Sequence, residues 1–274
     1  TAVLAVPPFE PGYHVLMATK SGLVKKTDLM AFSQPRAGGI IALSLLPNDE
    51  LISSRITDGT LNVFLGSLMG KSIRFHEADI RPSGRTSMGV RGMRIDGGDR
   101  IVAMEVLSHG QTLFAVTQNG YGKRTSIDEY PVQKRGGKGV ISIKTTQRNG
   151  LVVSILLVEE DNDLMLMTNN GKIIRMPFKG ISVISRNTQG VKVMGMDVGE
   201  RGVDRHLDFR EVVSGQRVAE LLYRGQRLEV VVVHLPVARD QRFPAHRSSP
   251  LRAARPGRSP CSSSSRLAPP PVET

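Results

Sequence analysis

The residues best suited to binding chemistry form one short, basic and glycine-rich stretch near the middle of the chain. It reads Gln133, Lys134, Arg135, Gly136, Gly137, Lys138 and Gly139. Glycine lets a backbone approach a phosphate closely and expose its N–H groups, while Lys and Arg supply positive charge. No aromatic side chain lies within the stretch to stack on a base, so it favours the backbone of a double-stranded nucleic acid. A solvated turn that joins two strands is the alternative interpretation.

Further Lys and Arg residues recur at corresponding places along the chain. One set follows a series of turns: Lys25, Lys26, Lys71, Arg74, Lys123, Arg124, Lys172 and Arg175. A second set accompanies a later glycine: Arg36, Arg85, Arg91, Lys134, Arg135, Lys138, Arg186 and Lys192. Charges repeated at regular intervals along a curved surface can neutralise successive phosphates of DNA. They can thereby offset the free-energy cost of bending the DNA, which is on the order of 1–6 kcal/mol for 20–30 base pairs. For part of the first set, Lys residues that only protect strand edges from aggregation are the alternative.

We therefore predict a DNA-binding surface built from the glycine-rich stretch and selected cations of both sets. The predicted contacts outside residues 133–139 are Arg36, Arg85, Arg91, Lys123, Arg124, Arg186 and Lys192. Such a surface should bind DNA with a steep dependence on salt and little dependence on base sequence, because it contacts phosphates.

Other residue patterns do not amount to a catalytic or metal site. Residues 66–72 read GSLMGKS, one residue short of a phosphate-loop motif, and lie at an expected turn between strands rather than at the start of a helix. The histidines have no catalytic motif around them. A single cysteine, Cys261, excludes a disulfide framework and a cysteine zinc site. We predict no catalytic residue, no metal site and no cofactor held by this chain.

The composition agrees with a polyanionic partner. The 274 residues carry a formal net charge of +12, and 39% of them are hydrophobic. That hydrophobic fraction argues against wholesale disorder, and no apolar run approaches the length of a membrane span. The first residues lack the basic and apolar regions of a signal peptide, which predicts a cytoplasmic location. A basic surface without any partner is the alternative.

Stepwise repetition is the clearest organising feature of the chain. Four segments of alternating apolar and turn residues end at Gly22, Gly70, Gly120 and Gly171. A second glycine recurs at Gly39, Gly89, Gly139 and Gly190, with gaps of 50, 50 and 51 residues. A polar turn residue keeps the same gaps at Asp49, Asp99, Asn149 and Glu200. Two markers with one period near 50 residues indicate a repeat array, with propeller-like blades as the leading candidate.

The repeats predict an all-β fold of about four blades, each with about four strands, that forms an incomplete disc. The predicted units are residues 3–50, 51–100, 101–151 and 152–200. Residues 201–274 contain no Lys and 13 Arg, together with clusters of Pro and Ser. We expect this tail to be largely disordered. The abrupt change in composition also suggests a shift of reading frame, which resequencing the coding region would test.

The motifs within the repeats resemble a known family. The stretch QKRGGKG is similar to the gyrase-A box, whose pattern is QRRGGKG, with Lys134 in place of the first Arg. The strings SGLVKKT at 21–27, GVRGMR at 89–94, TQNGYGKR at 117–124, KGVISIK at 138–144, RNGLVV at 148–153 and SRNTQGV at 185–191 also resemble the C-terminal domain of the DNA gyrase A subunit. The corresponding chain of topoisomerase IV has a related domain, but the completeness of SRNTQGV and of the box-like stretch favours gyrase.

The resemblance implies a β-pinwheel that wraps double-stranded DNA and so supports ATP-dependent negative supercoiling. The implied protein partners are the gyrase B subunit and a second copy of the gyrase A subunit. The resemblance implies that ATP, which the gyrase B subunit binds, and Mg are held by domains outside this chain. In the family the box lies on the first blade, whereas residues 133–139 belong to the third unit here. We therefore expect the true box upstream of Thr1.

The resemblance also implies that this chain does not cut DNA by itself. The family's catalytic tyrosine directly follows an arginine, and the four tyrosines here follow Gly12, Gly120, Glu129 and Leu222. A propeller-like scaffold whose basic rim binds an acidic protein is the alternative from another functional class.

Overall fold

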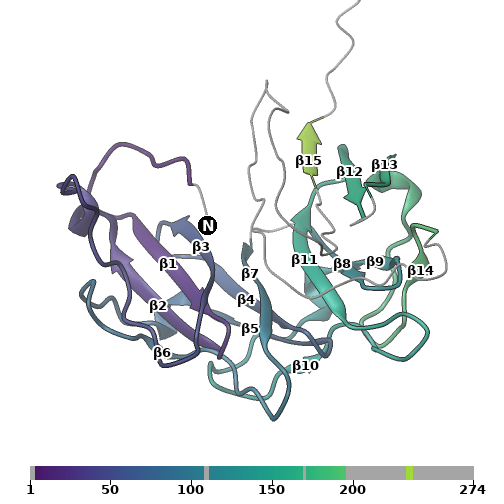
Figure 1. Ribbon diagram of the computed structural model, residues 1–274, viewed down its shortest axis with the longest axis horizontal. Coiled ribbons are helices and arrows are strands. Elements are labelled where there is room, and N and C mark those ends of the chain that lie inside the picture. Colours follow the sequence, from purple (N-terminus) through teal and green to yellow (C-terminus); the bar gives the residue numbers. More distant parts are fainter. Residues whose placement is uncertain (1–3, 108–110, 169–170, 196–232, 237–274) are drawn as a thin grey trace, which may run out of the picture. The chain divides into compact units, whose positions relative to one another are not determined.

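The computed structural model describes residues 4–107, 111–168, 171–195 and 233–236 (Figure 1). The strands in these ranges are β1 (His14–Thr19), β2 (Leu23–Asp28), β3 (Leu51–Thr57), β4 (Asn62–Ser67), β5 (Lys71–His76), β6 (Val90–Arg91), β7 (Ile101–Leu107), β8 (Thr112–Thr117), β9 (Tyr121–Ser126), β10 (Val140–Ile141), β11 (Val152–Val158), β12 (Asn162–Met167), β13 (Ile173–Pro177), β14 (Val191–Lys192) and β15 (Val233–Pro236). Single-turn 3-10 helices follow four of them: η1 (Leu29–Phe32), η2 (Glu77–Asp79), η3 (Ile127–Glu129) and η4 (Phe178–Gly180). No helix in these ranges is long and apolar enough to cross a membrane.

Successive hairpins form the centres of four antiparallel sheets. The hairpins are β1–β2, β4–β5, β8–β9 and β12–β13, and each turns at the first recurring glycine of its repeat. The strand orders are β3-β1-β2-β6, β7-β4-β5-β10, β11-β8-β9-β14 and β15-β12-β13. The predicted all-β architecture of about four blades is therefore confirmed within the described part of the chain.

Each of the second to fourth repeats lends a two-residue strand to the sheet of the repeat before it. β6 follows the second hairpin but pairs with β2 of the first, with Val90 opposite Val24. β10 pairs with β5 and β14 pairs with β9 in the same way. β3, β7 and β11, which border the other side of the first three hairpins, begin just after the expected unit boundaries. The sheets thus combine strands of neighbouring repeats, whereas the repeats led us to expect one sheet per unit.

This exchange explains several of the recurring glycines. Gly139 has φ +72°, and a Cβ added there would lie 2.2 Å from the carbonyl oxygen of Ser72 in the preceding repeat. A Cβ on Gly70, at φ +83°, would lie equally close, 2.2 Å from the carbonyl oxygen of Ile143 in the following repeat. Only glycine adopts such a backbone conformation without cost and also permits so close an approach.

The recurring polar residue also has a structural reason. Asp99 Oδ1 accepts hydrogen bonds from the backbone N–H groups of Met69 and Arg100, at 2.9 and 2.8 Å. Asp49 accepts in the same way from the N–H of Ser21, at 2.9 Å. Partial burial would raise the pKa of the Asp49 carboxyl, but the hydrogen bonds that it accepts, first of all from the Ser21 hydroxyl, outweigh this effect and hold the pKa below its ordinary value. The carboxylates therefore brace the hairpin turns, while the fourth marker, at residue 200, lies outside the described residues.

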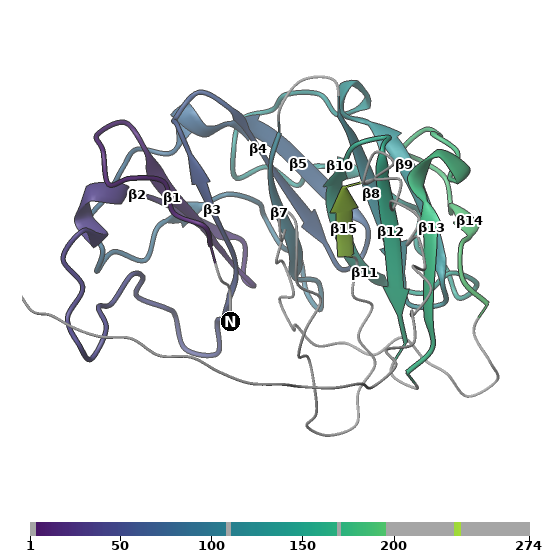
Figure 2. The ribbon, with the colours of Figure 1, turned by 90° about the horizontal axis from the view of Figure 1, so that it is seen from above.

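The hydrophobic core lies between successive sheets, which follow one another side by side in Figure 2. Along β8, Leu113 and Ala115 join one buried cluster, and Phe114 and Val116 join the next. Because side chains alternate along a strand, β8 contributes to the packing on both faces of its sheet. This two-sided burial accounts for the continuous apolar runs that the sequence shows in this strand.

One strand of the tail is described. β15 pairs with β12, on the side of the hairpin that β3, β7 and β11 occupy in the other sheets. The rest of the predicted disordered tail, residues 201–232 and 237–274, lies outside the described residues. The suggested shift of reading frame stays a prediction.

Candidate nucleic-acid interface

The box-like loop, residues 133–139, is held at the surface by the backbone of the preceding repeat. The N–H of Gln133 donates to the carbonyl oxygen of Arg74 at 2.7 Å, and the N–H of Gly136 donates to that of Gly92 at 2.6 Å. Lys134 and Lys138 are exposed on this loop. The loop therefore presents two cations from a backbone that is already fixed.

Arg135 both anchors the loop and contributes positive charge to the surface. Its Nε donates to the carbonyl oxygen of Asp79 at 2.9 Å, and its Nη1 donates to that of Arg91 at 3.1 Å. Both acceptors belong to the preceding repeat. The guanidinium thus joins the loop to its neighbour, and its charge remains at the exposed surface.

The corresponding loop of the fourth repeat repeats this arrangement. Arg186 Nη1 donates to the carbonyl oxygen of Ile141 at 3.1 Å, and Ile141 holds the position that Arg91 holds one repeat earlier. The Arg186 guanidinium also lies 5.8 Å from the ring centre of Tyr130, which is within the range of a cation–π contact. Arg186 is only half-buried, so part of its side chain still reaches the surface.

The structure does not place Lys123 and Arg124 on a DNA-facing surface, contrary to our expectation. Lys123 is 0% exposed, and its Nζ donates to the carbonyl oxygens of Ser185 and Arg186 and to Thr188 Oγ1. Burial, with a smaller contribution from the charge of Arg186, lowers the pKa of Lys123 to about 8. Such a buried ammonium positions the backbone of residues 185–188 and is not available to a phosphate.

Arg124 belongs to a series of cations that join each repeat to the next. Its Nε donates to the carbonyl oxygen of Ile181, just after η4, at 2.7 Å. At the corresponding positions, Lys26 Nζ donates to the carbonyl of Glu77 at 2.9 Å, and Arg74 Nη1 donates to that of Ile127 at 3.0 Å. Three members of the first cation set therefore recur because they tether the following 3-10 turn, which is neither the DNA contact nor the edge protection that we considered.

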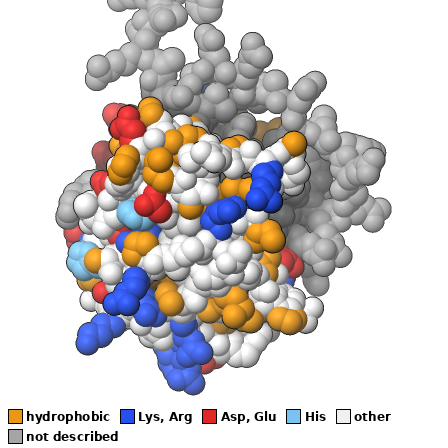
Figure 3. Space-filling view, turned by 90° about the vertical axis from the view of Figure 1, so that its left-hand side faces the viewer, with side chains coloured by type: hydrophobic (Ala, Val, Ile, Leu, Met, Phe, Trp, Pro, Cys, Tyr) orange, Lys and Arg blue, Asp and Glu red, His pale blue; other side chains and the backbone are white. Residues whose placement is uncertain are grey.

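The remaining predicted residues differ in exposure. Arg36, Arg91 and Lys192 are exposed, and Arg85 is half-buried beside Lys25, whose Nζ donates to the Arg85 carbonyl. Figure 3 shows Lys and Arg side chains in separate groups on the face that it presents, between hydrophobic and uncharged areas. On this face the cations are therefore grouped and do not form a continuous coat.

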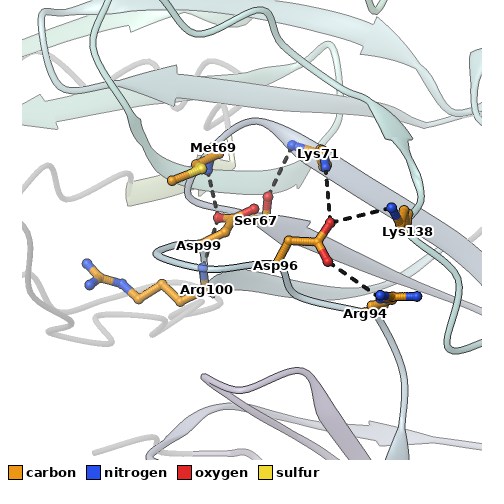
Figure 4. A network of polar contacts seen from close by, with 8 residues as sticks. All are labelled: Ser67, Met69, Lys71, Arg94, Asp96, Asp99, Arg100 and Lys138. Carbon is orange, nitrogen blue, oxygen red and sulfur yellow. Dashed lines mark hydrogen bonds and ion pairs between the residues drawn. The ribbon is translucent and has the colours of Figure 1, made fainter.

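Sequence reasoning missed Arg94 as a partner of the box-like loop, and it missed the grouping of Lys71, Arg94 and Lys138. These three cations surround Asp96 (Figure 4). The available signal was the period itself, because Lys144 stands 50 residues after Arg94. The backbone N–H groups of both residues donate to carbonyls of the following loop: Arg94 to Gly137 at 2.8 Å and Lys144 to Thr188 at 2.9 Å.

No group of three or more His, Cys, Asp or Glu side chains in the described ranges is arranged to hold a metal ion. The arrangement instead offers exposed cations on loops whose backbones are fixed by the neighbouring repeat. The arrangement can attract and orient an extended anion through the positive charge and the N–H donors of the exposed Lys and Arg side chains.

Comparison with known proteins identifies the family of the chain. A family profile described as "DNA gyrase C-terminal domain, beta-propeller" matches residues 13–58, 62–108, 111–159 and 162–202. The DNA gyrase A subunit of Salmonella typhimurium is 46% identical over 220 residues, which are 80% of this chain and 24% of that protein. The same protein of Escherichia coli is 43% identical over the same length. The chain spans about a quarter of the length of these relatives.

Solved structures share the architecture. A DNA gyrase A C-terminal domain aligns with a TM-score of 0.63 and 27% identity, covering 69% of this chain and 64% of that one. The C-terminal domain of a DNA topoisomerase IV aligns with a TM-score of 0.68 at 24% identity, which supports the fold alone; it covers 72% of this chain and 62% of that one. The expected pinwheel fold is thereby confirmed. On the strength of the four matched repeats, the chain belongs to the DNA gyrase C-terminal domain, beta-propeller, family.

Proposed function

We propose that this chain binds double-stranded DNA and bends it around the basic loops of its repeats, as the C-terminal part of a DNA gyrase A subunit. The observation that carries the proposal is the box-like loop, in which Lys134 and Lys138 are exposed on a backbone anchored to the preceding repeat. Family membership supports it, because the curated relatives are DNA gyrase A subunits.

The anchoring of the loops favours wrapping over binding at a single point. Residues 83, 133 and 184 begin equivalent loops, and each donates its N–H to the carbonyl of the basic residue that tethers two repeats. Equivalent loops on successive repeats offer phosphate contacts at regular intervals. Such contacts can together offset a bending cost on the order of 1–6 kcal/mol for a 20–30 base-pair segment.

In the whole protein, this bending would make two DNA segments cross with a fixed handedness. Strand passage at that crossing would then introduce negative supercoils. The gyrase B subunit together with a second gyrase A subunit would be the partners, and other domains would bind ATP and Mg. The chain by itself would bind DNA without cutting it and would hold no cofactor. The curated relatives are bacterial, so we place this activity on the chromosome in the bacterial cytoplasm.

Two assays with the full chain test the proposal. Fluorescence anisotropy with a duplex of about 40 base pairs, from about 50 to 200 mM salt, should give a steep linear fall of log affinity with log salt. Ligation of nicked plasmid on the protein should shift the distribution of topoisomers. A flat salt dependence, or binding without any topoisomer shift, would contradict wrapping.

A matched pair of variants locates the contact. Lys134→Gln with Lys138→Gln should weaken duplex binding several-fold and reduce the salt slope by about 2, since one phosphate contact contributes about 1. Lys179→Gln with Lys172→Gln removes the same charge from exposed positions of the last repeat and should have a smaller effect. If both pairs weaken binding equally, total charge and not the box-like loop determines affinity.

A scaffold that binds an acidic protein would leave plasmid linking number unchanged.

A further inference from the structure

Three cations from separate segments surround one carboxylate beside the box-like loop (Figure 4). Lys71 begins β5, Arg94 follows β6, and Lys138 lies in the box-like loop. Lys71 Nζ and Lys138 Nζ each lie 3.9 Å from Asp96 Oδ2, and Arg94 Nε lies 3.5 Å from Asp96 Oδ1. A single negative group therefore stands where three positive side chains meet.

These ion pairs contribute little to the stability of the fold. The side chains of Lys71, Arg94, Asp96 and Lys138 are 43%, 59%, 47% and 62% exposed. The distances exceed those of good hydrogen bonds, and exposed ion pairs of this kind contribute about 0–1 kcal/mol to stability. The adjacent carboxylate differs, because Asp99 accepts two backbone hydrogen bonds and braces a turn. Asp96 is therefore the acid in this turn that folding needs least.

The cations are held together by backbone contacts that do not involve Asp96. The N–H of Arg94 donates to the carbonyl of Gly137 at 2.8 Å, next to Lys138 in the chain. Pairing of β10 with β5 places Lys71 opposite Ile141, just after the box-like loop. The three-cation cluster should consequently persist when the carboxylate is replaced.

The turn that carries Asp96 lies at the open surface. Gly97 and Gly98 follow it, and a Cβ added to Gly97 would meet no atom of the described residues within 4 Å. The N–H of Asp99 donates to the carbonyl of Asp96 at 3.1 Å, which closes the turn without using the Asp96 side chain. The carboxylate can therefore leave the cluster while its backbone stays in place.

We propose that Lys71, Arg94 and Lys138 form a binding site for one DNA phosphate, and that Asp96 occupies this site as an internal competitor when DNA is absent. The inference rests on the proposed function and deepens it. A phosphodiester carries the same single charge as the carboxylate and offers oxygen acceptors to the same donors. Displacement of Asp96 then limits the affinity of the site, so the chain holds DNA less tightly than its cations alone would allow.

The test is Asp96→Asn, which removes the charge and nearly preserves the shape. With a duplex of about 40 base pairs, this variant should bind about 3–10-fold more tightly than the wild type near 50 mM salt, and the gain should shrink as salt rises. The matched control is Asp161→Asn, because Asp161 is an 83% exposed carboxylate paired with Lys179 in another repeat. The control should change affinity by less than about 2-fold.

A second comparison separates the cluster from a general charge effect. In the background of Asp96→Asn, replacing Lys71, Arg94 and Lys138 by Gln should abolish the gain. Replacing Lys20, Lys172 and Lys179 by Gln in that background should leave the gain in place. Thermal unfolding should place every variant within a few degrees of the wild type, which confirms that each is folded.

The outcomes distinguish this inference from the proposed function. If the wild type binds DNA but Asp96→Asn and Asp161→Asn behave alike, the competitor is refuted and the proposed function stands. If neither the wild type nor Asp96→Asn binds the duplex, both are refuted. A gain in Asp96→Asn that survives loss of all three cations would also refute the competitor.

Discussion

Gly139→Ala is the most direct test of the exchange of strands between repeats. Gly139 has φ +72°, and a Cβ there would lie 2.2 Å from the Ser72 carbonyl oxygen. The obstacle is backbone, so no rotamer change relieves it. Gly39 is the matched control, because it holds the equivalent position in the first repeat with φ +79° and no atom of the described residues within 4 Å of an added Cβ.

The two substitutions share one cost and differ in another. A positive φ costs an alanine about 1–2 kcal/mol at either position. At Gly139, β10 must also retreat by about 1 Å to restore ordinary contact. That retreat breaks the pairing of β10 with β5 and the hydrogen bond from the Ser142 N–H to the Gly70 carbonyl. Two or three lost hydrogen bonds at about 1 kcal/mol each bring the total to about 3–5 kcal/mol.

Thermal unfolding followed by circular dichroism measures the difference. Gly39→Ala should lower Tm by about 2–6 °C, and Gly139→Ala by roughly 10 °C or more. Hydrogen exchange should accelerate in residues 140–143 of the second variant alone. Equal shifts in Tm for the two variants would refute the close approach on which the exchanged sheet depends.

Three further predictions concern the cations that join repeats. Arg74→Leu should destabilise the fold by about 1–3 kcal/mol in urea unfolding, because the carbonyls of Ile127 and Tyr130 lose their donor; an unchanged free energy of unfolding would contradict this tether. Lys123→Ile should speed hydrogen exchange in residues 185–190, since three hydrogen bonds to this loop disappear, and unchanged exchange would contradict the anchoring role. The pKa of Lys123 is about 8 in the folded chain, below its ordinary value of 10.5. The unfolded chain therefore binds more protons between these two pH values, so wild-type stability should rise with pH there, relative to Lys123→Ile. Parallel pH profiles for the two proteins would rule out the lowered pKa.

The sequence predicted the repeats well because their markers are local. A glycine at a hairpin turn and a polar residue about 30 residues later recur at a fixed spacing, and in the first two repeats this polar residue is an acid that braces the turn. The partner of the second glycine leaves no such signal, because Gly139 contacts Ser72, which lies in a different repeat. The exchange of strands was therefore visible only in the structure.

The role of Lys123 escaped prediction for a related reason. Its carbonyl acceptors lie 62 and 63 residues further along the chain, so a buried ammonium and an exposed one look alike in sequence. A clue existed, because the equivalent positions in the four repeats are Lys25, Ile73, Lys123 and Ile174. Two of the four repeats have Ile at this position, which indicates that the position is buried. Lys25 and Lys123 are indeed only 1% and 0% exposed.

The burial of these cations changes how the basic charge of the repeats can act. Lys26, Arg124 and Lys123 donate hydrogen bonds to carbonyls of the next repeat, and Lys123 thereby fixes the loop that carries the half-buried Arg186. A loop that is ordered before DNA arrives loses little conformational entropy on binding. The internal cations would therefore support DNA binding through the rigidity of the surface, while contacts to phosphate are left to the exposed cations of the same repeats. Removing an internal cation should accordingly lower DNA affinity only where it also loosens a loop, which hydrogen exchange and anisotropy on the same variant would show together.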